Sequence, residues 1–200
     1  MGNPDFELCH KSGKNKLYNI LKAYSVLDPE LGYTQGMNFI VAMLLMNISD
    51  EESAFWCFIY IMYPSKPFKG VSGQHNWRQI FINLMPMVIY MEKKIRKKLQ
   101  KKAPQGLARI LEETDGETLH AAFSQQIISL FIIDQPYETA RRLFEVFLLK
   151  GREFIVKIIC EAVRLQQERI LNHELVIAYV KRDLLKESLQ IKGSIKALLS

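Results

Sequence analysis

The stretch at residues 28–38 reads Asp-Pro-Glu-Leu-Gly-Tyr-Thr-Gln-Gly-Met-Asn and stands directly before the most apolar part of the chain. Pro29 and Gly32 interrupt regular structure, because proline lacks a backbone N–H and glycine adopts conformations that other residues avoid. Nearly every residue in the range 37–46 is apolar, which is typical of a helix in the centre of a bundle. The sequence therefore predicts a sharp turn and then a buried helix that begins near Thr34.

An uncharged glutamine, Gln35, occupies the expected beginning of this helix. The first backbone N–H groups of a helix have no partners inside the helix and carry a partial positive charge, which suits anions such as phosphate. A glutamine amide offers an acceptor and two donors, with no charge of its own to desolvate. Gln35 is therefore the leading candidate for a functional residue. The alternative is an ordinary hydrated residue in a first helical turn.

These eleven residues resemble the Tyr-x-Gln segment of the TBC domain, a module of proteins that activate Rab-type GTPases. Residues 142–148, followed by Gly151, resemble that family's Arg-Ile-Trp-Asp-x-Phe-Leu segment, with Phe144 and Glu145 in place of the usual Trp and Asp. The resemblance implies an all-α, multi-helix fold. It further implies one N-terminally incomplete TBC domain over residues 1–200, with an N-terminal part at 1–102 and a C-terminal helical part at 103–200.

The resemblance also implies a function in vesicle trafficking. The protein would stimulate GTP hydrolysis by a Rab-family small GTPase in its GTP-bound state, and would not itself be an enzyme with its own cofactor. GTP and Mg²⁺ would be bound by the partner. Gln35 would be the catalytic glutamine finger, and Tyr33 would place it against the GTPase. The remaining GTPase-binding residues would be Gly32, Thr34 and Gly36.

One family feature is missing from this sequence. TBC domains carry an arginine finger in an Ile-x-x-Asp-x-x-Arg segment upstream of Tyr-x-Gln, whereas the first arginine here is Arg78. Lys11 and Lys14 lack the planar fork that spans two phosphate oxygens. We therefore expect weak activation, with a non-catalytic Rab-binding adaptor of the same fold as the alternative. Without upstream helices, one or more of three apolar residues should be poorly covered, namely Phe39, Val41 or Leu44.

A basic run at residues 93–102 has three interpretations. It is a solvated helix face, a surface that contacts an anionic membrane or an acidic partner, or a nucleic-acid site; the last is disfavoured because no aromatic residues are interleaved for stacking. A helical scaffold on the membrane surface is therefore a further alternative function. The candidate contact residues are Lys93, Lys94, Arg96, Lys97, Lys98, Lys101 and Lys102.

The composition fits an intracellular globular protein. The 200 residues include 48% hydrophobic ones and carry a formal net charge of +6. Three scattered cysteines and four scattered histidines form no disulfide or metal-ligand pattern, so we expect no metal site. No apolar run approaches the roughly 18 residues of a membrane span. We expect a cytoplasmic protein, with peripheral membrane association as an option and no nucleic-acid partner.

Apolar spacing and turn residues predict further helices on both sides of the deciding stretch. We expect Ser49 to cap one helix, Pro86 to kink another without ending it, and Trp56 and Trp77 to lie in the core. Arg141 and Arg142 should pair with Glu138 or Glu145, and Asn38 should brace the turn. The expected helices are 14–25, 49–62, 77–102, 107–113, 118–131, 137–149, 154–167 and 174–186, with a long loop at 63–75 as a second contact region.

Overall fold

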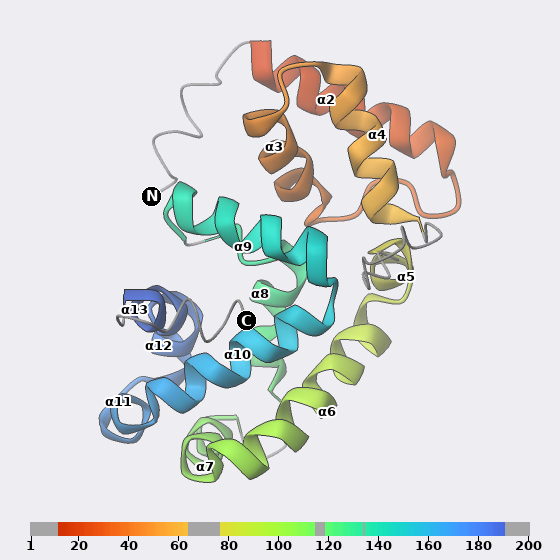
Figure 1. Cartoon of the computed structure of the whole chain (residues 1–200). Helices are drawn as coiled ribbons and strands as arrows, with labels where there is room; N and C mark the ends of the chain where they lie inside the picture. Colours follow the sequence, from red (N-terminus) through yellow and green to blue (C-terminus); the bar gives the residue numbers. More distant parts are fainter. Residues whose placement is uncertain (1–11, 64–76, 115–118, 134, 191–200) are drawn as a thin grey trace. The chain divides into compact units, whose positions relative to one another are not determined.

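The computed structural model describes residues 12–63, 77–114, 119–133 and 135–190, and within these ranges it is all-α (Figure 1). The expected loop at 63–75 lies outside the described residues except for Tyr63, which follows the last residue of a helix. The helices are α2 (Ser12–Leu27), α3 (Met37–Asn47), α4 (Glu51–Met62), α5 (Trp77–Ile82), α6 (Leu84–Lys102), α7 (Pro104–Glu112), α8 (His120–Ser129), α9 (Tyr137–Lys150), α10 (Glu153–Leu165), α11 (Gln167–Asn172), α12 (Val176–Arg182) and α13 (Leu184–Gln190).

The chain divides into two compact units that both draw on distant parts of the sequence. Unit 1 comprises the described residues of 1–84 and 128–151, and unit 2 those of 85–127 and 152–200. This division differs from the expected boundary between residues 102 and 103, because α9 belongs with α2 to α5 although it is far away in sequence.

Helix α3 forms the centre of unit 1, packed against α2 and α4. Val41 is fully buried and Leu44 is 4% exposed, so the expectation of poor cover is wrong for both. Phe39 is half-buried. The two flanking helices cover α3 because apolar residues surround it on nearly all sides.

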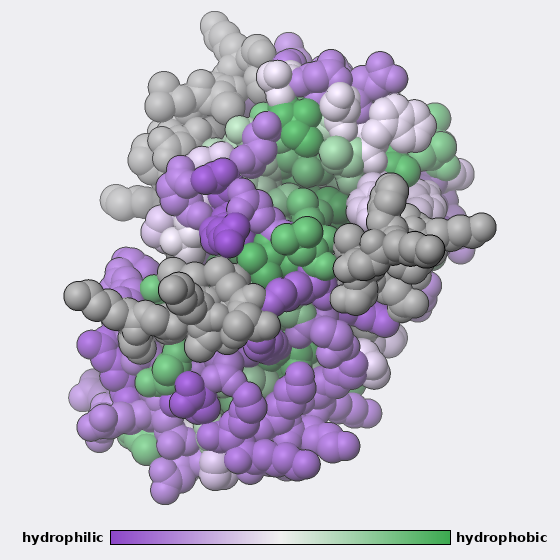
Figure 2. Space-filling model, viewed as in Figure 1, coloured by the Kyte–Doolittle hydropathy of each residue, from purple (hydrophilic) through white to green (hydrophobic). Residues whose placement is uncertain are grey.

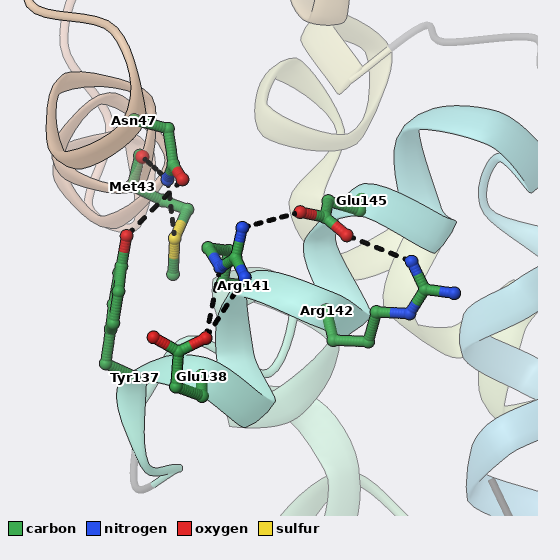
Figure 3. Close-up of polar contacts among 7 residues, drawn as sticks. All are labelled: Met43, Asn47, Tyr137, Glu138, Arg141, Arg142 and Glu145. Atoms are coloured by element: carbon green, nitrogen blue, oxygen red, sulfur yellow. Dashed lines mark hydrogen bonds and ion pairs between the residues drawn. The ribbon is translucent and has the colours of Figure 1, made fainter.

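Helix α9 is joined to the end of α3 through polar contacts within unit 1 (Figure 3). The Tyr137 hydroxyl donates to Asn47 Oδ1 at 3.3 Å, and Asn47 Nδ2 donates to the Met43 carbonyl oxygen at 2.7 Å. On α9 itself, Arg141 bonds Glu138 and Glu145, and Arg142 bonds Glu145, which confirms the predicted pairs. The buried side of α9 consists of Ala140, Leu143, Phe144, Val146 and Phe147.

The two tryptophans differ in burial, which corrects one expectation. Trp77 is 1% exposed and packs edge-on against Phe147 with ring centroids 5.1 Å apart. Trp56 is 58% exposed, and its indole N–H donates to Glu52 on the same helix. Helical spacing places Trp56 beside the apolar residues of α4, but only tertiary packing determines which side of that helix is covered.

Helix boundaries differ from expectation for identifiable reasons. Asp50, not Ser49, caps α4, and its carboxylate accepts the Ser53 N–H at 2.8 Å. The expected kinked helix at 77–102 is two helices that separate at Asn83. Pro86 explains this break, because proline cannot donate to the carbonyl four residues earlier, yet fits in the first turn of the next helix. The long C-terminal helices likewise divide, at Gln166 and Asp183.

In unit 2, α10 packs against α7, α11 and α13, and two ion pairs join it to α6. Ion pairs join Lys94 to Glu153 and Lys102 to Glu161, with the same separation of 59 residues, so the two helices run parallel. Val88, Met91, Ile95 and Leu99 form the buried side of α6. No helix among the described residues is long and apolar enough to cross a membrane.

Candidate functional site

The segment between α2 and α3, residues 28–36, is anchored by one buried carboxylate. Asp28 is 5% exposed. Its oxygens accept hydrogen bonds from the Tyr24 and Tyr63 hydroxyls, both at 3.0 Å. Arg78, at the start of α5, donates to the same carboxylate through Nε at 2.5 Å and Nη2 at 3.0 Å. Side chains from three other parts of unit 1 therefore converge at the beginning of this segment.

Hydrogen bonds within this cluster shift the pKa values of its members and favour the ionised form of Asp28. The hydrogen bond from Arg78 holds the pKa of Asp28 well below its ordinary value, and the bonds from Tyr24 and Tyr63 act in the same direction, against the effect of burial. Burial and then the hydrogen bond to Asp28 raise the pKa of Tyr24 far above its ordinary value. Arg78 also donates to Glu30 at 2.6 Å, so its guanidinium connects both sides of Pro29.

Two glycines in this segment have positive φ, and their surroundings differ. Gly32 has φ +62°, and its N–H donates to the Asp28 carbonyl at 2.8 Å. No atom lies within 4 Å of where a Cβ would stand on Gly32. Gly36 has φ +110°, and a Cβ there would lie 2.6 Å from Ile128 Cγ2 and 3.3 Å from Phe81 Cε1. Gly36 is therefore buried, and its backbone lies close to Ile128 of the same unit.

The end of the segment places Gln35 on the surface. Asn38 Oδ1 accepts the Gly36 N–H at 3.3 Å and the Tyr33 hydroxyl at 3.4 Å, which confirms that Asn38 braces the turn. Tyr33 is 54% exposed, Thr34 is half-buried, and Gln35 is exposed. Among the described residues, no hydrogen bond holds the Gln35 carboxamide. An unpaired amide therefore stands at the surface on a fixed backbone.

The beginning of α3 differs from the expected anion site. The helix starts at Met37 rather than near Thr34, and Met37 is fully buried. Its N–H donates to the Thr34 carbonyl, the Gly36 N–H to Asn38, and the Phe39 N–H to the Gly36 carbonyl. These three N–H groups therefore have partners within unit 1 and are not available to an anion.

The basic residues of the 93–102 run lie on α6, in unit 2. Lys94 and Lys102 are paired with acids of α10, as described above. Lys93, Lys97, Lys98 and Lys101 are exposed, and among the described residues they form no ion pair. Arg96 is half-buried. The predicted site residues therefore form two separate groups, one in each unit.

The described residues contain no group of histidine, cysteine and acidic side chains that could hold a metal ion. Cys57 is exposed and Cys160 is buried. Burial raises the pKa of the Cys160 thiol to about 11, so this thiol is protonated and unreactive near neutral pH. Cys9, His10 and His75 lie outside the described residues.

Sequence reasoning missed the residues that anchor the loop. Asp28 begins the stretch quoted above, and a carboxylate next to a proline turn is a common backbone cap, so a local signal was present for this residue. Arg78 and Tyr63 stand 50 and 35 residues away from Asp28, respectively. No local pattern indicates that such distant residues meet.

Comparison with known proteins identifies the family. The family model for the Rab-GTPase-TBC domain matches residues 3–171. TBC1 domain family member 1 of Homo sapiens is 30% identical over 195 residues, which cover 97% of this chain and 15% of that protein. GTPase-activating protein GYP5 of Saccharomyces cerevisiae is 28% identical over 156 residues, which cover 78% of this chain and 16% of that protein.

A solved structure agrees with these sequence matches. The crystal structure of the Chlamydomonas flagellar RabGAP TBC domain superposes with a TM-score of 0.70 and 18% sequence identity, over 96% of this chain and 60% of that one. This similarity confirms the all-α fold of the TBC domain. The chain spans about one sixth of the length of the two curated relatives named above. With a family match over most of its length, the chain belongs to the Rab-GTPase-TBC domain family.

Proposed function

We propose that this protein regulates a Rab-family small GTPase by binding its GTP-bound state and stimulating GTP hydrolysis. The observation that carries the proposal is the exposed carboxamide of Gln35, which has no hydrogen-bond partner among the described residues and stands on a segment fixed by the buried carboxylate of Asp28. The names of the relatives support the same class of activity, because they include a GTPase-activating protein and a RabGAP domain.

The chemistry of GTP hydrolysis explains why a positioned amide is useful. The reaction is limited by the orientation of the attacking water and by charge on the transferred phosphoryl group, and activators supply groups for both in trans. The Gln35 carbonyl oxygen can accept a proton of that water while its NH₂ group donates toward a phosphate oxygen. GTP and Mg²⁺ are then held by the GTPase, and this chain needs no cofactor.

Some neighbours of Gln35 contact the GTPase, and one supports the segment from inside unit 1. Tyr33 and Thr34 are accessible and contact the GTPase, as does the backbone at Gly32. Gly36 is buried, so it supports the segment against Ile128 instead of reaching a partner. A fixed support reduces the conformational entropy that the segment loses when it docks.

A second candidate function is a Rab-binding adaptor that does not accelerate hydrolysis. It is favoured by the state of Arg78, the arginine nearest to Gln35 in the sequence, whose guanidinium is bound to both Asp28 and Glu30. An arginine held in this way inside unit 1 does not reach a phosphate on a partner. In the adaptor, Tyr33 and Gln35 contribute only to binding.

Single-turnover GTP hydrolysis by a panel of Rab GTPases distinguishes the two functions. We expect the chain to accelerate hydrolysis by at least one Rab, and Gln35→Ala to reduce the accelerated rate by about 100-fold or more, as for other preorganised donors. The matched control is Gln105→Ala, because Gln105 is also exposed but lies on α7. Binding without acceleration supports the adaptor, and equal rates for the two variants would contradict the role of Gln35.

A further inference from the structure

Helix α6 presents a continuous exposed stripe on the side opposite its buried residues. The exposed positions recur at helical spacing, whereas Val88, Met91, Ile95 and Leu99 are at most 1% exposed on the other side. At 1.5 Å per residue the stripe is about 22 Å long. Its members are Pro86, Ile89, Tyr90, Lys93, Lys97, Gln100 and Lys101.

The stripe has an apolar half and a basic half. Ile89 and Tyr90 are 43% and 44% exposed, and they are neighbours at one end of the stripe. Lys93, Lys97 and Lys101 continue along the same side. Lys94, at the border of the stripe, lies 4.7 Å above the centre of the Tyr90 ring.

The lysines of the stripe remain available for a partner because other lysines contact α10. Lys94 and Lys102 bind Glu153 and Glu161, the acids that α10 directs toward α6. The described residues offer no acidic partner to Lys93, Lys97 or Lys101. In Figure 2, most of the residues seen over α6 are hydrophilic, whereas hydrophobic residues are seen over α3.

We propose that the α6 stripe binds the surface of a membrane that contains anionic lipids. The lysines attract the negative headgroups, and Ile89 and Tyr90 enter the boundary between headgroups and acyl chains. Tyrosine suits this depth because it combines an apolar ring with a polar hydroxyl. This inference does not depend on Gln35 or on GTP hydrolysis, because the stripe lies in unit 2 and Gln35 in unit 1.

The lysines suit any anionic surface, and the placement of the apolar residues favours lipid over nucleic acid. The aromatic and aliphatic residues stand together at one end of the stripe instead of alternating with the lysines, so they offer no series of stacking platforms for bases. A straight row of exposed side chains on a convex helix matches a flat surface that is uniformly negative. The +6 net charge of the whole chain adds to the attraction toward an anionic surface.

Sedimentation of the whole chain with lipid vesicles tests the proposal. We expect binding to phosphatidylcholine vesicles that contain phosphatidylserine, little binding to pure phosphatidylcholine, and weaker binding at high salt. Lys93→Glu combined with Lys97→Glu should lower the partition coefficient by roughly 30-fold or more, because each lysine near such a surface contributes about fivefold. Ile89→Ser should weaken binding in low and high salt alike.

A matched control separates position from total charge. Lys181→Glu combined with Lys186→Glu also replaces two exposed lysines of unit 2, and both double variants change the net charge from +6 to +2. This control should keep most of the vesicle binding. Circular dichroism should show the same helix content for all variants, since every changed residue is exposed.

Three outcomes would overturn the proposal. They are equal vesicle binding by the two double variants, no binding by the unaltered chain, and binding that does not require phosphatidylserine. If the α6 double variant lost affinity for a Rab GTPase in the absence of lipid, while the unaltered chain did not bind vesicles, the stripe would be a protein-binding surface instead.

Discussion

The segment at 28–36 and the exposed stripe of α6 use charged residues in opposite ways. Asp28 is buried and accepts hydrogen bonds from Tyr24, Tyr63 and Arg78, so its charge fixes the backbone that carries Gln35. Lys93 and Lys97 are exposed and unpaired among the described residues, so their charge is available to a partner. The buried charge of Asp28 thus fixes the position of the backbone around it, whereas the exposed charges of Lys93 and Lys97 attract anionic partners.

The largest difference between the two regions should appear on removal of Asp28. Asp28→Ala leaves the donors of Arg78, Tyr24 and Tyr63 without their shared acceptor, and we expect it to destabilise the fold by about 3 kcal/mol. Urea denaturation measures this change. Glu30→Ala is the matched control, because Glu30 binds the same Arg78 but its side chain is 73% exposed; it should cost no more than about 0.5 kcal/mol. Equal costs for the two variants would mean that the cluster does not hold the segment.

The lowered pKa of Asp28 predicts that the stability of the fold depends on pH. The pKa of Asp28 is lower in the folded state than in the unfolded state, so the stabilisation is fully present above the unfolded value of about 4. It is lost as the pH falls from about 4 toward the lower folded pKa. The free energy of unfolding of Asp28→Ala should therefore fall less steeply between neutral pH and about pH 3 than that of the unaltered chain.

Substitution of the two glycines tests whether the segment is fixed by packing or only by backbone conformation. Gly36→Ala should destabilise unit 1 by about 2 kcal/mol, because it combines positive φ with a contact of 2.6 Å to Ile128. Gly32→Ala has free space, and its φ of +62° is a left-handed value that other residues adopt at smaller cost than the +110° of Gly36, so it should cost about 1 kcal/mol. Thermal unfolding orders the two variants. A larger loss for Gly32→Ala would contradict the packing of Gly36 on Ile128.

The smallest effect is expected for the ion pairs between α6 and α10. Although burial raises the pKa of Glu161, hydrogen bonds from Lys102 and Arg164 outweigh it and hold this pKa below its ordinary value. Glu161→Gln should nevertheless destabilise the fold by less than about 1 kcal/mol, because its basic partners are largely hydrated. High salt should reduce the difference further. A loss as large as that of Asp28→Ala would show that the two regions do not differ as described.

Particular elements show how far the sequence could predict the structure. Helix α3, the inward side of α9 and the pairs of Arg141 and Arg142 with Glu138 and Glu145 were predictable, because each depends on residues three or four apart. The exposure of Trp56 and the grouping of α9 with α2 to α5 were not predictable, since both depend on which helices meet. For the candidate site, the sequence indicated Gln35, Tyr33 and the bracing by Asn38, but not the anchor formed by Asp28 and Arg78.

The sequence by itself determined the family and the helical class and singled out Gln35 as a candidate, because motifs and helical periodicity are local properties of the chain. Only the tertiary structure decided that Gln35 is exposed while Gly36 is buried, and that Asp28 meets a guanidinium 50 residues away. The physical reason is that burial and the pairing of charges depend on contacts between distant segments. Those contacts form only when the helices pack.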